Sequence, residues 1–162
     1  MARFVYPDKG DFLIFIDLIR DSNYAVRRFL PPISEEWFEL ISNCVVYVEQ
    51  TSSYENNLSF HEVCARILYK VAKRHELGDG NKRSSVMAVY LFCLLNDYSI
   101  LKPEIIKQQA KRAAKSKGRM NEELMRGRIA SVLEKVIRPM DPEVLRKIRE
   151  NDNEETGSTA TT

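Results

Sequence analysis

Residues 59–72, SFHEVCARILYKVA, carry the clearest helical pattern in the chain. Their apolar side chains recur at intervals of three and four residues, so they lie along one face of a helix. Ser59 and Glu62 have the spacing of a capping box, in which each side chain accepts a hydrogen bond from a free backbone N–H group. The segment therefore predicts an amphipathic helix, whose apolar face consists of Phe60, Val63, Cys64, Ile67, Leu68, Val71 and Ala72.

A second helix is expected to begin near Asn81 and to continue through the sequence KRSSVMAVYLFCLLN. From Val86 to Leu95 the chain is apolar on nearly every side of such a helix, which predicts a central, buried position. A buried strand is the competing interpretation. The length of the run and its lack of internal turn residues favour the helix.

The rest of the chain adds to an all-α class, a compact helical bundle around the buried central helix. Pro103 and Pro142 stand at first helical positions, where a missing N–H group costs nothing. The segment QTSSYENN, residues 50–57, is either a plain loop or a short exposed flap hairpin. We expect one domain over residues 1–150 and a disordered tail over residues 151–162. The remaining helices are predicted over residues 8–22, 34–50, 103–117, 120–138 and 142–150.

The composition is that of an ordinary globular protein. The chain has 162 residues, of which 44% are hydrophobic and 30% charged, and its net charge of +2 gives no global field for nucleic acid. Cys44, Cys64 and Cys93 are odd in number and widely spaced, which favours buried free thiols in a reducing compartment. No signal-peptide pattern opens the chain, and its longest apolar run is too short to cross a bilayer. We therefore expect a cytoplasmic protein without a membrane partner.

The segment HELGDGNKR, residues 75–83, joins the two helices, and its residues favour the binding of an anion. It places a turn at a helix N-terminus, where unpaired N–H groups and the helix dipole attract negative charge. Gly78 and Gly80 allow a positive φ and a close approach of the backbone to a ligand. Lys82 and Arg83 are unusual in a first helical turn, and a bound anion would make them favourable there.

Two further side chains of this segment suit phosphoryl chemistry. Asp79 offers the hard oxygen that Mg²⁺ prefers, and this ion needs only one or two carboxylates beside phosphate oxygens. His75 can accept a hydroxyl proton near neutral pH. A P-loop is excluded, because the glycine spacing differs and a helix precedes the segment where that motif requires a strand.

The nine residues closely resemble the motif of the Fic/Doc family, H-x-F-x-[D/E]-[A/G]-N-[G/K]-R, with Leu77 in place of the aromatic residue. The resemblance extends from about Thr51 to Asn96. It implies that His75 is the general base and that Asp79 binds Mg²⁺ on the nucleotide phosphates. It also implies an anion hole formed by Gly80, Asn81 and Arg83.

Two positions resemble the Doc branch of that family. Members that transfer AMP usually have glycine where this chain has Lys82, and a second arginine where it has Val86. The resemblance therefore implies a toxin that moves phosphate from ATP or another nucleoside triphosphate to a protein Ser or Thr hydroxyl. The Doc target is elongation factor Tu, and an antitoxin segment covers the site. Protein AMP transfer and a non-catalytic binding module remain the alternatives.

A basic run extends from Lys102 to Arg119, with Glu104 as its one acidic residue. Such a run usually forms a solvated helix face. Alternatively, its positive charge would suit binding to an acidic antitoxin or to RNA. No aromatic residue interrupts the run, which weakens the case for nucleic acid. Its basic members are Lys102, Lys107, Lys111, Arg112, Lys115, Lys117 and Arg119.

Overall fold

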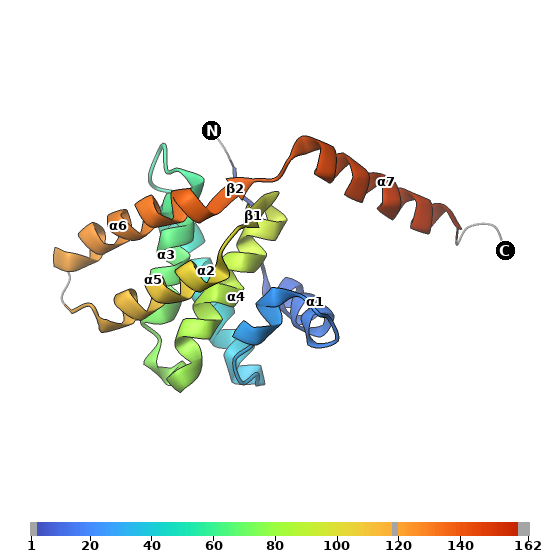
Figure 1. The fold of residues 1–162 in the computed structure, drawn as a ribbon. Coiled ribbons are helices and arrows are strands. Elements are labelled where there is room, and N and C mark those ends of the chain that lie inside the picture. Colours follow the sequence, from blue (N-terminus) through green and yellow to red (C-terminus); the bar gives the residue numbers. More distant parts are fainter. Residues whose placement is uncertain (1–2, 118–119, 159–162) are drawn as a thin grey trace.

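The computed structural model describes residues 3–117 and 120–158, which form a helical bundle (Figure 1). Helices account for most of these residues, so the all-α class is confirmed. The α-helices are α1 Lys9–Arg20, α2 Glu35–Ser52, α3 Phe60–Ala72, α4 Asn81–Leu95, α5 Pro103–Lys115, α6 Met120–Val136 and α7 Pro142–Ser158. The 3₁₀ helices are η1 Ala25–Phe29 and η2 His75–Gly80, and the strands are β1 Tyr98–Ile100 and β2 Ile137–Pro139.

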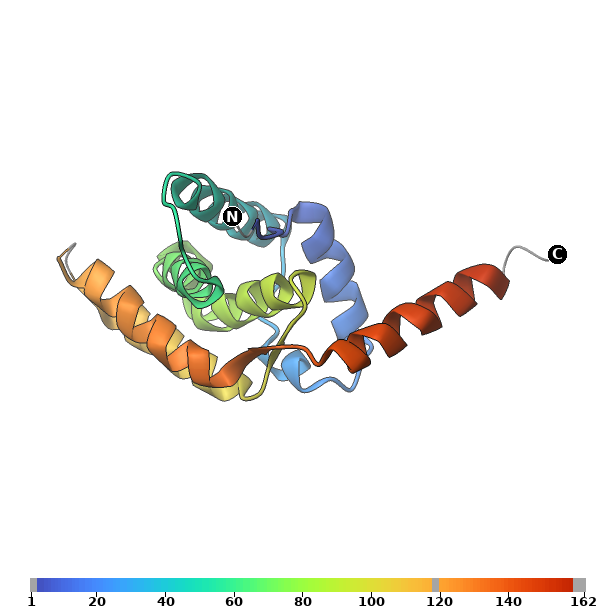
Figure 2. The same ribbon diagram turned by 90° about the horizontal axis from the view of Figure 1, so that it is seen from above.

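Helices α3 and α4 form the centre of the bundle. They pack against each other, α2 and α6 also contact α3, and α5 contacts both (Figures 1 and 2). Val86, Met87, Val89 and Phe92 of α4 are fully buried, which confirms the central helix. The predicted capping box is also present at the start of α3, where Ser59 and Glu62 exchange side-chain and backbone hydrogen bonds.

The short sheet was not predicted from the sequence. Strands β1 and β2 pair antiparallel, with Tyr98 opposite Pro139 and Ile100 opposite Ile137. Each strand has three residues, too few for an alternating pattern to stand out. The Tyr98 ring stacks on Phe60 with 3.8 Å between centroids, so the strand is fixed by an aromatic contact with α3.

Of the two interpretations of residues 50–57, the structure has the one without a hairpin, because α2 continues to Ser52 and turns lead from there to α3. Helix α7 continues beyond residue 150 as far as Ser158, over part of the segment for which we expected a disordered tail, and residues 159–162 lie outside the described part. No proline interrupts this segment, and its glutamates support helix propagation from residue 142. Figure 2 shows α7 leading away from the bundle.

The three cysteines are free and buried, as expected. Burial raises the pKa of the Cys64 thiol well above its ordinary value, so this thiol is not an activated nucleophile. Among the described residues, no helix combines the length and the apolar character that crossing a membrane requires.

Candidate functional site

The segment 75–83 forms a tight connection between the end of α3 and the start of α4. Helix α3 ends at Ala72, and Lys73 follows it in a helical conformation as the C-cap. The backbone N–H group of His75 donates to the Lys73 carbonyl at 3.1 Å, and that of Leu77 donates to Arg74 at the same distance. The 3₁₀ turn η2 then leads directly into α4, as the sequence predicts for a turn at a helix N-terminus.

Gly80 is required at this turn for a different reason from the one expected. Its φ is −82°, an ordinary helical value, so no left-handed conformation is needed here. An added Cβ would lie 3.2 Å from Cβ of Pro31, closer than most carbon contacts allow. The glycine therefore lets the 30–34 segment approach the start of α4. The atom that comes close to its backbone on this side belongs to Pro31, whereas we expected a ligand to approach the glycine.

The Asn81 side chain joins the two central helices. It is 5% exposed, and its Nδ2 group donates to the Ala72 carbonyl at 2.8 Å. Its Oδ1 atom accepts a hydrogen bond from the Lys82 backbone N–H group, also at 2.8 Å. Both ends of the amide are thus used within the protein. Asn81 fixes the shape of the turn, and one of the two hydrogens on its Nδ2 atom is engaged by the Ala72 carbonyl.

Two buried hydrogen bonds connect the turn to α2. The Trp37 indole Nε1 group of α2 donates to Ser84 Oγ at 2.8 Å, and Ser84 Oγ in turn donates to the Gly80 carbonyl. Ser84 is fully buried, so these bonds form away from water. Trp37 is therefore both a buried packing residue and a hydrogen-bond donor to the start of α4.

Three cations surround the turn. Lys82 and Arg83 lie half-buried in the first turn of α4, which contains no acidic residue. Arg83 Nη1 donates to the Leu30 carbonyl at 3.1 Å, which leaves the rest of its guanidinium group for other partners. Arg74 Nε lies 3.4 Å from Cys44 Sγ. Burial raises the pKa of Cys44, and the nearby Arg74 partly opposes that effect.

His75 and Glu76 are exposed on the turn, while Leu77 is half-buried against the hydrophobic core. Leu77 therefore anchors the turn with an apolar contact. The surroundings of Gly78 and of the Asp79 side chain lie outside the described part of the structure. Elsewhere in the described residues, no three His, Cys, Asp or Glu side chains gather as a metal site.

The segment before α3 has a structural contact of its own. The Glu55 carboxylate forms an ion pair with Arg66 of α3, with 2.6 Å between Oε2 and Nη2. The neighbouring histidine of α3 is structural as well, since His61 Nε2 lies 2.8 Å from the Ile137 carbonyl of β2. The sequence does not indicate this contact between α3 and the small sheet, because His61 lies on the polar side of the helix and its partner is 76 residues away.

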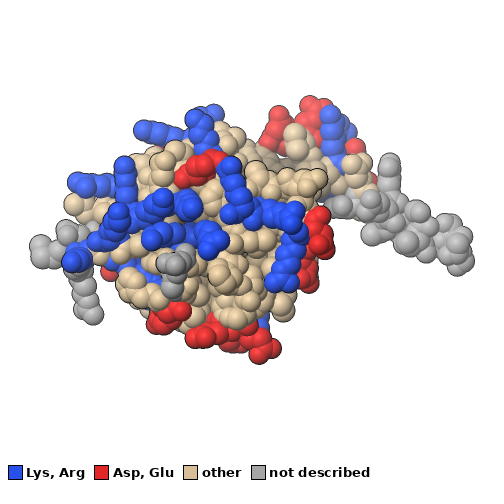
Figure 3. All heavy atoms as spheres, turned by 60° about the horizontal axis from the view of Figure 1, so that its bottom comes forward, with Lys and Arg blue, Asp and Glu red and all other residues tan. Residues whose placement is uncertain are grey.

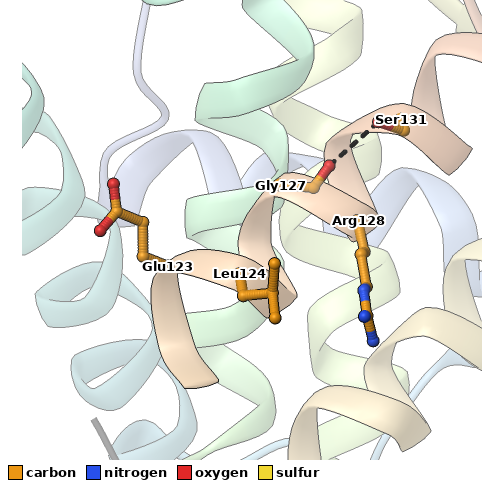
Figure 4. A pocket seen from close by; sticks show the side chains of 5 residues that line it. All are labelled: Glu123, Leu124, Gly127, Arg128 and Ser131. Carbon is orange, nitrogen blue, oxygen red and sulfur yellow. Dashed lines mark hydrogen bonds between the residues drawn. The ribbon is translucent and has the colours of Figure 1, made fainter. Parts of the chain in front are cut away.

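A hollow of about 530 Å³ lies away from the turn, on α6 (Figure 4). All of its lining residues come from this one helix, and an added Cβ at Gly127 would meet no atom within 4 Å. The hollow is therefore open helix surface around a glycine, and it offers no converging polar groups. Its lining residues are Glu123, Leu124, Gly127, Arg128 and Ser131.

Comparisons with known proteins give no match for this chain, whether against family models, curated proteins or solved structures.

Proposed function

We propose that the chain transfers a phosphate from a nucleoside triphosphate to a protein Ser or Thr hydroxyl, at the junction of η2 and α4. One observation carries the proposal. The segment 75–83 forms a turn that ends at a helix N-terminus, with an exposed histidine on one side and two cations on the other. This is the arrangement of acceptor base and anion site that its resemblance to the Fic/Doc motif implies.

The start of α4 suits a phosphate for physical reasons. No side chain caps this helix at Gly80, and its first turn contains Lys82 and Arg83 without an acidic residue. The positive end of the helix dipole attracts an anion, and the two cations increase that attraction. A triphosphate such as ATP would reduce the repulsion between these cations when bound.

Each remaining residue has a role in the proposal. His75 would accept the proton of the attacking hydroxyl, whose oxygen forms a bond to the γ-phosphorus while the bond to the β-phosphate oxygen breaks and ADP leaves. Gly80 and Asn81 would hold the turn in shape, and Gly78 would belong to the same phosphate-binding loop. Mg²⁺, held by Asp79 and phosphate oxygens, would supply neutralising charge.

Val86 favours phosphate transfer over AMP transfer. It occupies the position at which AMP-transferring members usually have a second arginine, and it is fully buried in the core. Even a rearranged turn would leave no guanidinium group at this position to hold a distal phosphate.

The test uses the purified full chain, Mg²⁺ and ATP labelled at either the α or the γ phosphate, with elongation factor Tu as the first acceptor and a cell lysate as the second. We expect label on the acceptor from γ-labelled ATP only. His75→Ala should reduce transfer by about 10²- to 10⁴-fold, because a general base contributes about that much.

Glu76→Gln is the matched control on the same exposed turn: it releases Arg74 from a 3.6 Å ion pair but removes no proposed base, so it should change the rate far less than His75→Ala does. Label from the α phosphate would establish AMP transfer and refute phosphate transfer. Equal labelling by the wild type and by His75→Ala, or no labelling of any acceptor, would refute the proposed function.

A further inference from the structure

The outward face of α5 is strongly basic. Lys107, Lys111 and Lys115 recur at every fourth position, so they lie on one side of the helix at intervals of about 6 Å. The opposite side of α5 is buried in the bundle through Ile106 and Ala110. Figure 3 shows Lys and Arg side chains gathered across this side of the molecule. The cations of α5 therefore point to solvent as a group.

Few acidic groups compensate this charge. Glu104, the one acidic residue of α5, pairs with Arg28 of the neighbouring η1 segment. Within the described residues, Lys111 and Lys115 form no ion pair. By contrast, α2 carries four glutamates and no lysine or arginine. The basic residues of α5 thus remain available to a partner.

A hollow of about 330 Å³ marks the place where α5 meets η1. The guanidinium group of Arg28 and the Lys107 ammonium group lie 5.0 Å and 6.0 Å from the centroid of the Phe29 ring. The buried ring therefore holds two cations at the edge of the hollow, where Arg28 pairs with Glu104 and Lys107 continues the basic face of α5. The lining residues are Arg28, Phe29, Glu104, Lys107, Gln108 and Lys111.

The chemistry of this face favours a nucleic acid over a protein. None of the exposed large apolar side chains of the described residues belongs to α5. Protein interfaces are depleted of lysine at their cores and use aromatic and apolar anchors, whereas nucleic-acid interfaces are polar and strongly positive. Single-strand binding also relies on stacking aromatic side chains, which the face lacks. Binding to the phosphate backbone of a duplex needs no stacking side chain.

We propose that the outer face of α5 binds the phosphate backbone of duplex nucleic acid without reading its bases. This face is connected to the turn of residues 75–80. Lys73, just before the turn, donates a hydrogen bond to the Ser116 carbonyl at the end of α5, and Tyr69 OH lies 3.1 Å from Ser116 Oγ. A duplex along α5 would therefore extend toward the turn, although the binding does not depend on phosphate transfer.

The test measures binding of the full chain to a fluorescent DNA duplex of about 20 base pairs at several salt concentrations. Each neutralised phosphate contributes about −0.9 to the slope of log K against log salt. The three lysines predict a loss of affinity of about 40-fold between about 50 and 200 mM salt. The variant Lys107→Gln/Lys111→Gln/Lys115→Gln should bind more weakly, and its affinity should change little over the same range.

The control variant is Lys9→Gln/Arg20→Gln/Lys147→Gln, which removes the same charge from exposed positions of α1 and α7 and should keep the wild-type slope. His75→Ala should bind the duplex as the wild type does. Circular dichroism checks the folding of each variant, and Lys111→Gln/Lys115→Gln replaces the triple variant if that one unfolds. Equal weakening in the control would overturn the proposal, because net charge alone would then explain binding. Binding of a polyglutamate peptide in preference to the duplex would overturn it too.

Discussion

The junction of α3 and α4 and the outer face of α5 both contain polar and charged residues, but they use them in opposite ways. At the junction Asn81, Ser84 and Ser85 are buried, and each is hydrogen-bonded to backbone carbonyls. On α5 the lysines face solvent. Buried polar groups must find partners within the protein, so they specify one shape of the turn. Exposed cations have little effect on shape and remain able to bind. Four predictions test this contrast.

The largest effect on stability is expected from the core beneath the junction. Leu68 of α3 is fully buried in the hydrophobic core. Leu68→Ala should lower the free energy of unfolding by about 2–5 kcal/mol, because it removes buried methyl groups and leaves a cavity. Urea unfolding followed by the fluorescence of Trp37, the single tryptophan, measures the change. A loss below 1 kcal/mol would show that this part of the core is loosely packed.

The next largest effect concerns the amide that joins the helices. Asn81→Ala should cost about 1–3 kcal/mol, because it leaves the buried Ala72 carbonyl without its side-chain donor. Asn81→Asp keeps an acceptor for the Lys82 N–H group but replaces the donor with a buried carboxylate facing the Ala72 carbonyl, so it should cost at least as much as Asn81→Ala. The same unfolding measurement applies. If Asn81→Ala leaves the free energy of unfolding unchanged, the shape of the junction does not depend on this side chain. The contrast between the junction and the outer face of α5 would then not hold.

A smaller effect should appear as a dependence on pH. The hydrogen bond and charge of Arg66 hold the pKa of the Glu55 carboxyl below its ordinary value. A depressed folded-state pKa stabilises the protein above the unfolded-state value of about 4.3, and this contribution disappears as the pH falls through the folded-state pKa. Glu55 is half-exposed, so solvent screening limits the contribution to less than about 1 kcal/mol.

Glu55→Gln removes this contribution. The stability difference between wild type and variant should therefore shrink from about pH 6 to about pH 3, as measured by urea midpoints. A difference that stays constant across this range would show that the ion pair does not form in solution.

The smallest effect is expected on α5. Lys111→Gln should change the free energy of unfolding by no more than about 0.5 kcal/mol, because Lys111 is exposed and makes no ion pair within the described residues. Thermal unfolding measures it. A loss comparable to that of Asn81→Ala would mean that the basic face supports the fold, and its proposed role in binding would lose its main argument.

The sequence predicts the α3–α4 pair well, because its signals are local. The periodic apolar residues from Phe60, the capping box at Ser59 and the uniformly apolar run after Val86 each determine structure within a few residues. What the sequence does not reveal depends on distant partners. Gly80 is required by Pro31, and Ser84 is paired with Trp37, and neither partner is suggested by the segment 75–83 itself.

In the candidate site, too, the features that the sequence predicts are local, and those that it does not predict depend on distant residues. The exposed histidine, the turn and the half-buried cations Lys82 and Arg83 follow from the order of residues along the segment. That the Asn81 amide is already engaged by Ala72 could not be predicted, because it depends on how closely the end of α3 approaches the start of α4. Likewise, the hollow beside α5 needs Arg28 and Phe29 of η1, a segment outside every helix that the sequence predicts.

The two-stranded ladder has a consequence for the order in which the chain assembles. It joins Ile100 to Ile137, so it closes a loop that contains all of α5 and α6. Closing such a loop has an entropic cost that local helix formation does not have, and long-range pairings generally form late. The strand amides should therefore gain protection from hydrogen exchange only after α6 has docked, and their exchange in the native state reports on the release of that helix.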